Sequence, residues 1–391
     1  MATASSNPFA IEVIDPPSGV PSWYSSAPSG TWVEVPGSTF SASPVFTAAA
    51  AAGLISYGYG NARYVVEAWN SGVLNTVGVY HNGVFVPGIF LIIFGGGHGD
   101  YAGNEVYAFG PLNSASPSWR MLTNPTIPPP INVGRDANGM PVSRHTYDTL
   151  GYLAQSNRMI SVAAPPMYQL GGSDNTADTF SFGVNPQSTN PWTPIGRITM
   201  SGAYGTQMVC CAVDELAGKV YAMVRQSHLN IYDIASNTWT TRTGVFGWDW
   251  WTCTCDIDPN TKVIVQVDGQ STNGGPRTFG IDVRNPSVSV PTFQITAAGM
   301  PSGLATSVVW DQRTGKFVVW MDNRTLYYLT PPANPYQGSG WTWSTVTPSA
   351  GASPGAGHTQ GTFKRFGPMP ATMPGYYLMP RYDQPVYIYK P

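Results

Sequence analysis

Arginine, histidine and tyrosine side chains gather in Gly-rich or polar segments that separate apolar runs. Arg144, His145 and Tyr147 lie within one such segment, and His98 lies in another. A histidine and a tyrosine can act as general base and acid, and an arginine can neutralise a carboxylate beside the proton that is removed. These four residues are therefore the catalytic candidates if the protein is an enzyme.

The same kind of segment could instead bind carbohydrate. Sugars stack their apolar C–H faces on flat rings while their hydroxyls bind Asn, Asp and Arg side chains, and Gly247–Trp251 contains three tryptophans. Alternation along a strand turns neighbours to opposite sides, so one or two of these rings are expected in the core. The candidate ligand-binding residues are His98, Asp100, Tyr101, Arg144, His145, Arg225, His228, Trp248, Trp250, His358 and Arg381.

Glycoside hydrolysis finds less support, because it needs two carboxylates about 5–10 Å apart. The acidic candidates form no evident pair; they are Asp100, Asp148, Asp174 and Asp249. A structural role also stays open for His98 and Asp100, since the glycines around them suit a tight turn after a buried strand.

The four cysteines occur as two close pairs, Cys210 with Cys211 and Cys253 with Cys255, in apolar segments that we expect to be inner strands. Alternation turns the first two side chains opposite ways and the second two the same way. A tetrahedral zinc site needs four converging thiolates, which this pattern does not provide, and one disulfide between the strands is an alternative. We expect buried free thiols acting as small apolar side chains, with no metal and no other cofactor.

Charge is scarce in this chain. The chain contains 19 Lys and Arg residues and 21 Asp and Glu residues, which give a net charge of −2. Hydrophobic residues make up 42% of the sequence. Disordered chains combine low hydrophobicity with high net charge, so disorder is excluded. The absence of clustered basic residues argues against nucleic-acid binding, and the longest apolar stretches are far shorter than the about 20 residues of a membrane span.

The first basic residue is Arg63, so the N-terminus does not predict a secretory signal, whose first region is basic. We expect a soluble protein on a virion or an extracellular surface that arrives there without a signal peptide.

Several segments share one pattern of four short strands. In the clearest copy, Met208–Thr243, two apolar strands joined by a turn precede a polar loop, a strand with tyrosine and a strand with tryptophan. Short strands every about 8–12 residues indicate an all-β fold, and a period of about 45–50 residues is typical of propeller blades. An aromatic residue marks the outer strand of each copy, at Trp32, Trp119, Trp192, Trp239, Phe293 and Trp343.

This pattern predicts a single β-propeller of six blades, or of seven if Phe46–His81 forms another. The last copy, Gly361–Tyr389, lacks one strand, and Gly30–Pro36 offers a strand with no preceding copy. Pairing of that N-terminal strand with the last blade would close the ring and cover both edges. We therefore divide the chain into an N-terminal extension, 1–29, and a propeller, 30–391, whose first complete blade is expected to begin within Val65–Thr76.

The two ends of such a ring differ in their chemistry. In an antiparallel blade, the start of strand 1 and the loop between strands 2 and 3 lie at one end, here the loop end. The turns between strands 1 and 2 and between strands 3 and 4 lie at the other, here the turn end. All catalytic and binding candidates fall at the loop end, whereas residues 215–218, 258–262 and 312–315 predict plain turns at the turn end.

The segments FGGGHGDYAGNEVYAF, PVSRHTYDTLGYL with RM…GG…DTFSF, and the closing GTFKRF…PVYIYK resemble kelch-type β-propellers of the galactose-oxidase central-domain kind in bacteria and their phages. The resemblance covers roughly Val65–Pro391. It implies the fold, but such propellers carry many chemistries, so function has to be argued from the site. Copper oxidation of the galactose-oxidase kind would need a cysteine beside an active-site tyrosine, and these cysteines lie within inner strands.

Two functional hypotheses follow. The first is a glycan-binding or structural propeller, an adhesin or receptor-binding component of a virion or another surface assembly, with carbohydrate and other assembly proteins as partners. The second is a polysaccharide lyase acting on uronate-containing glycans; the resemblance to propeller lyases implies histidine and tyrosine as base and acid and arginine on the uronate carboxylate. Neither requires nucleic acid, a membrane span or a cofactor, and the sequence leaves a homo-oligomer open.

Overall fold

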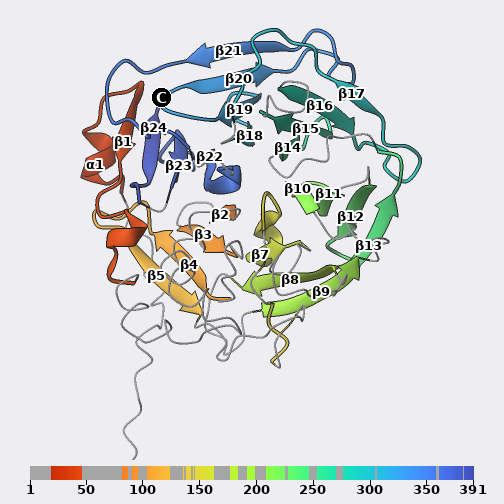
Figure 1. Cartoon of the computed structure of the whole chain (residues 1–391), viewed down its shortest axis with the longest axis horizontal. Coiled ribbons are helices and arrows are strands. Elements are labelled where there is room, and N and C mark those ends of the chain that lie inside the picture. Colours follow the sequence, from red (N-terminus) through yellow and green to blue (C-terminus); the bar gives the residue numbers. More distant parts are fainter. Residues whose placement is uncertain are drawn as a thin grey trace, which may run out of the picture.

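Six four-stranded antiparallel sheets form a closed ring (Figure 1). The structure is a computed structural model that describes residues 19–45, 82–86, 90–95, 104–123, 135, 138–141, 144, 146–162, 177–183, 192–198, 208–224, 228–245, 253–269, 276–303, 306–357, 361–381 and 383–391. Strands that follow one another along the chain pair in each sheet, apart from one N-terminal strand. The predicted six-bladed β-propeller is confirmed.

The blades are numbered along the chain. Blade 1 contains β2 (Asn82–Val86), β3 (Phe90–Phe94), β4 (Val106–Gly110) and β5 (Ser118–Thr123). Blade 2 contains β6 (Leu150–Leu153), β7 (Arg158–Ser161), β8 (Ala177–Gly183) and β9 (Trp192–Ile198). Blade 3 contains β10 (Met208–Asp214), β11 (Lys219–Val224), β12 (His228–Asp233) and β13 (Thr238–Arg242).

The second half of the ring continues the pattern. Blade 4 contains β14 (Thr254–Asp258), β15 (Val263–Asp268), β16 (Arg277–Asp282) and β17 (Thr292–Gln294). Blade 5 contains β18 (Ser307–Asp311), β19 (Lys316–Trp320), β20 (Leu326–Thr330) and β21 (Thr342–Val346). Blade 6 contains β22 (Phe366–Pro368), β23 (Tyr376–Leu378), β24 (Tyr387–Lys390) and β1 (Thr31–Glu34).

Helical structure among the described residues is confined to single turns. These are α1 (Ser22–Ser25), η1 (Phe40–Ala42), η3 (Ala154–Ser156) and η4 (Phe363–Arg365). None of the described helices has the length and hydrophobicity needed to cross a membrane.

Apolar side chains point to both faces of each sheet, because each blade has a neighbour on either side. In β3, Leu91 and Ile93 pack against blade 6, whereas Ile92 and Phe94 pack against blade 2. A strand covered on both faces has a continuous apolar sequence rather than an alternating one. Six buried clusters result, one between each pair of neighbouring blades.

The N-terminal strand closes the ring as predicted. In β1, Trp32 pairs with Tyr389 of β24 across an antiparallel ladder. The Trp32 side chain is 1% exposed, and its indole N–H donates to the carbonyl oxygen of Arg324 in blade 5 at 2.9 Å. The same indole therefore joins the last blade to its neighbour as well as filling their shared core.

The first complete blade begins later than the sequence predicted. Its first strand is β2, Asn82–Val86, and not a strand within Val65–Thr76, which lies outside the described residues. The sequence pattern offered an earlier apolar segment of similar length, and hydrophobicity alone does not choose between two such segments. The strand β2 pairs with β3 from Asn82 opposite Phe94 to Val86 opposite Phe90.

Replacing Trp32 by alanine should lower the free energy of unfolding by about 3–5 kcal/mol, because a fully buried indole and its hydrogen bond are lost. Trp343 occupies the outer strand of blade 5 but is only half-buried, so Trp343→Ala is the matched control and should cost clearly less. Urea unfolding of the two variants measures the difference. Equal losses would contradict the role of Trp32 in closing the ring.

Candidate functional site

Most of the predicted site residues lie outside the part of the chain that the structure describes. These are His98, Asp100, Tyr101, His145, Arg225, Trp248, Trp250 and His358. Their roles stay predictions. The four that are described, Arg144, Tyr147, His228 and Arg381, fall into a buried pair and a surface pair.

Arg144 and Tyr147 are both buried. Arg144 is 3% exposed, and its guanidinium carbon lies 5.0 Å from the centre of the Phe180 ring in blade 2. Tyr147 is 6% exposed and packs edge-on against Phe363 of η4, with ring centres 6.3 Å apart. A guanidinium over an aromatic face is a stabilising contact, so both side chains contribute to the packing around the start of blade 2.

His228 and Arg381 lie at the protein surface. His228 is the half-buried first residue of β12, where it pairs with Val224. Arg381 follows β23 and makes a two-pronged ion pair with Asp383, with both hydrogen bonds 3.0 Å long. Both partners are more than a third exposed, so solvent weakens the pair. Both residues sit at the loop end, as the topology predicted.

The strongest polar cluster of the described residues lies at the centre of the ring, around Lys364 of η4. Its ammonium donates to the main-chain carbonyls of Cys211 at 2.5 Å and Cys255 at 2.9 Å, and to Asp148 Oδ2 at 3.2 Å. These acceptors come from the starts of blades 2, 3 and 4, while Lys364 itself precedes blade 6. One side chain thus holds four blades together.

Asp148 receives further hydrogen bonds at the same carboxylate oxygen. The Cys255 N–H donates to its Oδ2 at 2.8 Å, and Thr254 Oγ1 donates at 3.1 Å. The Asp148 main chain contributes too, since its carbonyl accepts from the Cys211 N–H at 2.7 Å. Asp148, which precedes β6 of blade 2, therefore joins that blade to blades 3, 4 and 6.

Burial and ion pairing act in opposite directions on this cluster. Burial raises the pKa of Asp148 to about 7, although Lys364 and the hydrogen bonds from Cys255 and Thr254 favour the carboxylate. Burial disfavours the Lys364 ammonium, but Asp148 and neighbouring groups hold its pKa well above the usual value. The ammonium therefore keeps its proton inside the protein, where the carboxylate and carbonyl oxygens replace water.

The turn η4 directs Lys364 to this position. Phe363 has φ of +51° and Tyr147, which it touches, has φ of +39°. Left-handed conformations are costly for bulky residues and persist only where surrounding contacts hold them. Phe363 is held by its N–H, which donates to the Thr306 carbonyl at 3.2 Å, and by its own carbonyl, which accepts from the Ser307 hydroxyl.

Arg365, the next residue, turns away from Lys364 and is fully buried near blade 1. Its guanidinium donates to the carbonyls of Gly361 at 2.7 Å and Thr362 at 3.1 Å. Burial lowers its pKa to about 9. The consecutive basic residues of the motif GTFKRF thus both serve the interior of the ring, with Arg365 fully buried and the Lys364 side chain 13% exposed.

The innermost strands are also joined directly. The Thr146 hydroxyl donates to the Phe94 carbonyl between blades 1 and 2, and the Val308 N–H donates to Thr254 Oγ1 between blades 4 and 5. The Trp310 N–H donates to Asp256 Oδ2 at 2.7 Å across the same boundary. These bonds satisfy main-chain groups that a closed ring would otherwise bury unpaired.

The turn end is more than the row of plain turns that the sequence suggested. Asp214 Oδ1 accepts from the Ala217 N–H within its turn, and the same carboxylate pairs with Lys262 of blade 4 at 2.8 Å. Asp311 accepts from the Arg313 N–H in its turn and from the Tyr376 hydroxyl of blade 6 at 2.6 Å. Aspartate at the end of strand 1 therefore both shapes a turn and ties two blades.

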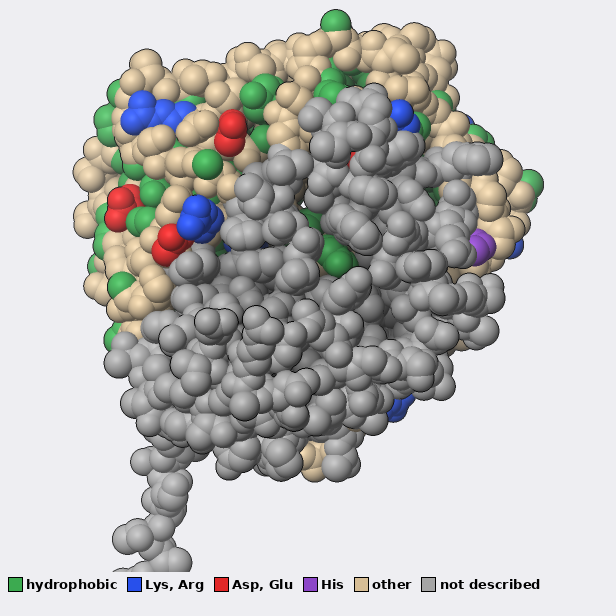
Figure 2. Space-filling model, viewed as in Figure 1, with side chains coloured by type: hydrophobic (Ala, Val, Ile, Leu, Met, Phe, Trp, Pro, Cys, Tyr) green, Lys and Arg blue, Asp and Glu red, His purple; other side chains and the backbone are tan. Residues whose placement is uncertain are grey.

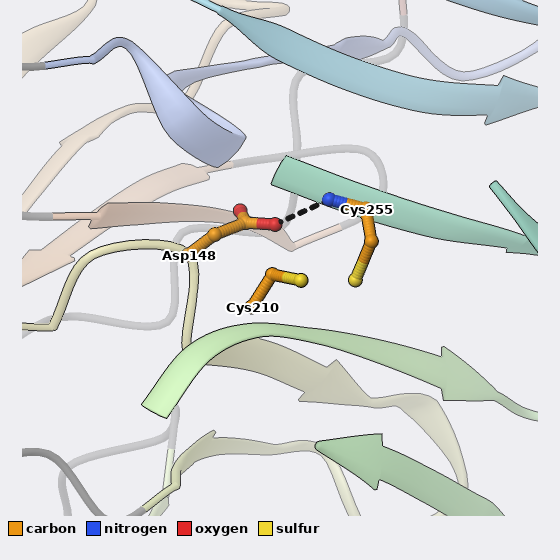
Figure 3. A group of neighbouring side chains, drawn as sticks. All are labelled: Asp148, Cys210 and Cys255. Atoms are coloured by element: carbon orange, nitrogen blue, oxygen red, sulfur yellow. Dashed lines mark hydrogen bonds between the residues drawn. The ribbon is translucent and has the colours of Figure 1, made fainter. Parts of the chain in front are cut away.

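All four cysteines are buried, and none of them forms a disulfide in the described part of the structure, in line with the expectation of buried thiols. Cys211 packs between blades 2 and 3, whereas Cys210, Cys253 and Cys255 pack between blades 3 and 4. This division follows the predicted alternation. The Sγ atoms of Cys210 and Cys255 and a carboxylate oxygen of Asp148 lie within 4.8 Å of one another (Figure 3).

Comparisons with known proteins find a likeness in fold only. No family model and no curated protein matches the chain. A protein of unknown function from Bacteroides thetaiotaomicron aligns with a TM-score of 0.46 and 10% identity over 80% of this chain and 69% of its own. The protein YjhT aligns with a TM-score of 0.40 and 10% identity, over 69% of this chain and 79% of its own. A chain of the nidogen–laminin complex aligns with a TM-score of 0.39 and 8% identity, over 71% of this chain and 82% of its own. The sheet order itself defines the class, a six-bladed β-propeller.

Replacing Lys364 by methionine should lower the free energy of unfolding by about 3–5 kcal/mol, because the variant buries a carboxylate without its partner. The control is Lys219→Met, which removes a partly exposed ion pair with Asp233 and should cost less than about 1 kcal/mol. Chemical unfolding followed by tryptophan fluorescence compares the two variants. A Lys364→Met loss as small as that of Lys219→Met would contradict the role assigned to the central cluster.

Proposed function

We propose that this propeller is of the kelch type and binds carbohydrate through its loop end, as an adhesin or receptor-binding component of a virion or another surface assembly. The sequence segments that resemble kelch propellers support the type. The loop-end candidates, rich in aromatic, histidine and arginine side chains, support the class of ligand.

The proposal rests mainly on one feature of the described surface, where charged side chains are paired with partners close by. Six ion pairs join described residues, and four of them lie at the turn end, where they hold turns and blades together. At the loop end, Arg381 is paired with Asp383, and the Arg324 guanidinium donates to the carbonyls of Gly351 and Ala352.

A surface whose charges are paired in this way creates little field beyond it. Figure 2 shows few, separated charged side chains on the described part of the face in view. Polyanions are captured by clusters of unpaired Lys and Arg, whereas neutral sugars need hydroxyl partners and flat rings. We therefore favour uncharged glycans over uronate polymers as ligands.

The alternative, a polysaccharide lyase, depends on Arg144 reaching a uronate carboxylate. The Arg144 side chain is buried against the Phe180 ring, and a guanidinium held there disfavours the lyase alternative. Tyr147, the proposed acid, is likewise buried against Phe363. Carbohydrate and other proteins of the assembly are the partners that we propose.

Replacing Trp250 by alanine should weaken glycan binding about five- to tenfold, since one ring stacked on a sugar contributes about 1–1.5 kcal/mol. Leu216→Ala is the control, because Leu216 is 71% exposed in a turn at the opposite end. A glycan array with neutral and uronate glycans, followed by titration calorimetry, measures both variants.

The lyase alternative has its own signal. Incubation with uronate polysaccharides would release unsaturated products that absorb in the ultraviolet, and His145→Ala would abolish their release. We expect no such products and unchanged binding by His145→Ala in folded protein. Turnover that His145→Ala removes would overturn the proposal in favour of the lyase, and no binding to any glycan would overturn both.

A further inference from the structure

We infer that Asp148, Cys210 and Cys255 form a binding site for a thiophilic divalent cation of the zinc class. The three residues come from the starts of blades 2, 3 and 4 and meet beside the centre of the ring. Figure 3 shows the two sulfur atoms and the carboxylate facing a common space. This site is independent of the proposed carbohydrate function.

The donor atoms are already close to a coordinating arrangement. They lie within 4.8 Å of one another. A tetrahedral zinc ion, with bonds of about 2.3 Å to sulfur and about 2.0–2.2 Å to oxygen, separates its donors by about 3.4–3.8 Å. Movements of about 1 Å or less would therefore bring the three donors to bonding distance, with the fourth position left for water or another group.

The Asp148 carboxylate has an oxygen to offer. Its Oδ2 accepts the hydrogen bonds from Lys364, Thr254 and Cys255, but its Oδ1 is buried and has no hydrogen-bond partner in the described part of the structure. A buried carboxylate oxygen without a partner is costly. Coordination of a cation through Oδ1, with the carboxylate turning this oxygen toward the two sulfur atoms, would remove that cost.

The charges balance when the ion is bound. Binding releases the two thiol protons to water and leaves two thiolates and one carboxylate, a charge of −3. A divalent ion and the Lys364 ammonium together supply +3. Lys364 remains in place because the carbonyls of Cys211 and Cys255 hold it independently of the carboxylate.

The test is the metal content and spectrum of the full chain. Because the site is buried, the protein is expressed in medium supplemented with Zn²⁺ or with Co²⁺, so that the ion can enter during folding. We expect about one ion per chain and, for Co²⁺, a thiolate-to-cobalt charge-transfer band. We also expect the zinc-loaded protein to melt at a higher temperature than protein refolded with a chelator.

Variants assign the ion to the three residues. Cys210→Ser and Cys255→Ser should each remove the charge-transfer band and weaken metal retention by more than about 100-fold, and Asp148→Asn should shift the band and weaken retention. Cys211→Ser is the matched control and should keep the band, because its sulfur packs on the opposite side of β10, 3.6 Å from the Leu150 carbonyl.

Wild-type protein alone decides the question if the serine variants do not fold. Metal-free protein without a charge-transfer band, and with a melting temperature that zinc during folding does not change, would overturn the inference. A band that survives in both Cys210→Ser and Cys255→Ser, or that Cys211→Ser removes, would place any bound ion elsewhere and overturn it as well.

Discussion

The buried ammonium of Lys364 is the interaction on which the centre of this propeller depends. Six strands begin around the centre, and their first main-chain groups and the Asp148 carboxylate are removed from water there. Lys364 supplies a charge and three hydrogen bonds to blades 2, 3 and 4 from a turn that belongs to blade 6. A buried pair of this kind adds little net stability over an apolar substitute, but it makes the arrangement of the blades specific.

The rest of the architecture follows from covering every blade on both faces. Continuous apolar strands supply six clusters between blades, and β1 with Trp32 closes the ring between the last blade and its neighbours. Little interior space is left for charge, and some of the charged residues that are buried join neighbouring blades. Lys262 with Asp214 and Tyr376 with Asp311 do so at the turn end.

Local sequence patterns predicted the blades well and the centre poorly. Repeated strands, outer aromatic residues and the N-terminal closing strand all have signals within a few dozen residues, and cysteine alternation sorted Cys211 from Cys210 correctly. Asp148 and Lys364 are 216 positions apart, and a single lysine in GTFKRF has no local feature that predicts a buried partner. The convergence of Asp148 with Cys210 and Cys255 was missed because four thiolates were sought, whereas the third donor is a carboxylate.

Native-state amide hydrogen exchange measures whether the cluster around Lys364 holds the blades together. The Cys211 N–H donates to the Asp148 carbonyl and the Cys255 N–H donates to the Asp148 carboxylate, beside Lys364. If this cluster holds the blades together, both amides should exchange only through global unfolding, with an opening free energy equal to that from denaturant unfolding. Exchange as fast as that of the outer strand β13 would contradict the account, because the centre would then open while the ring stays folded.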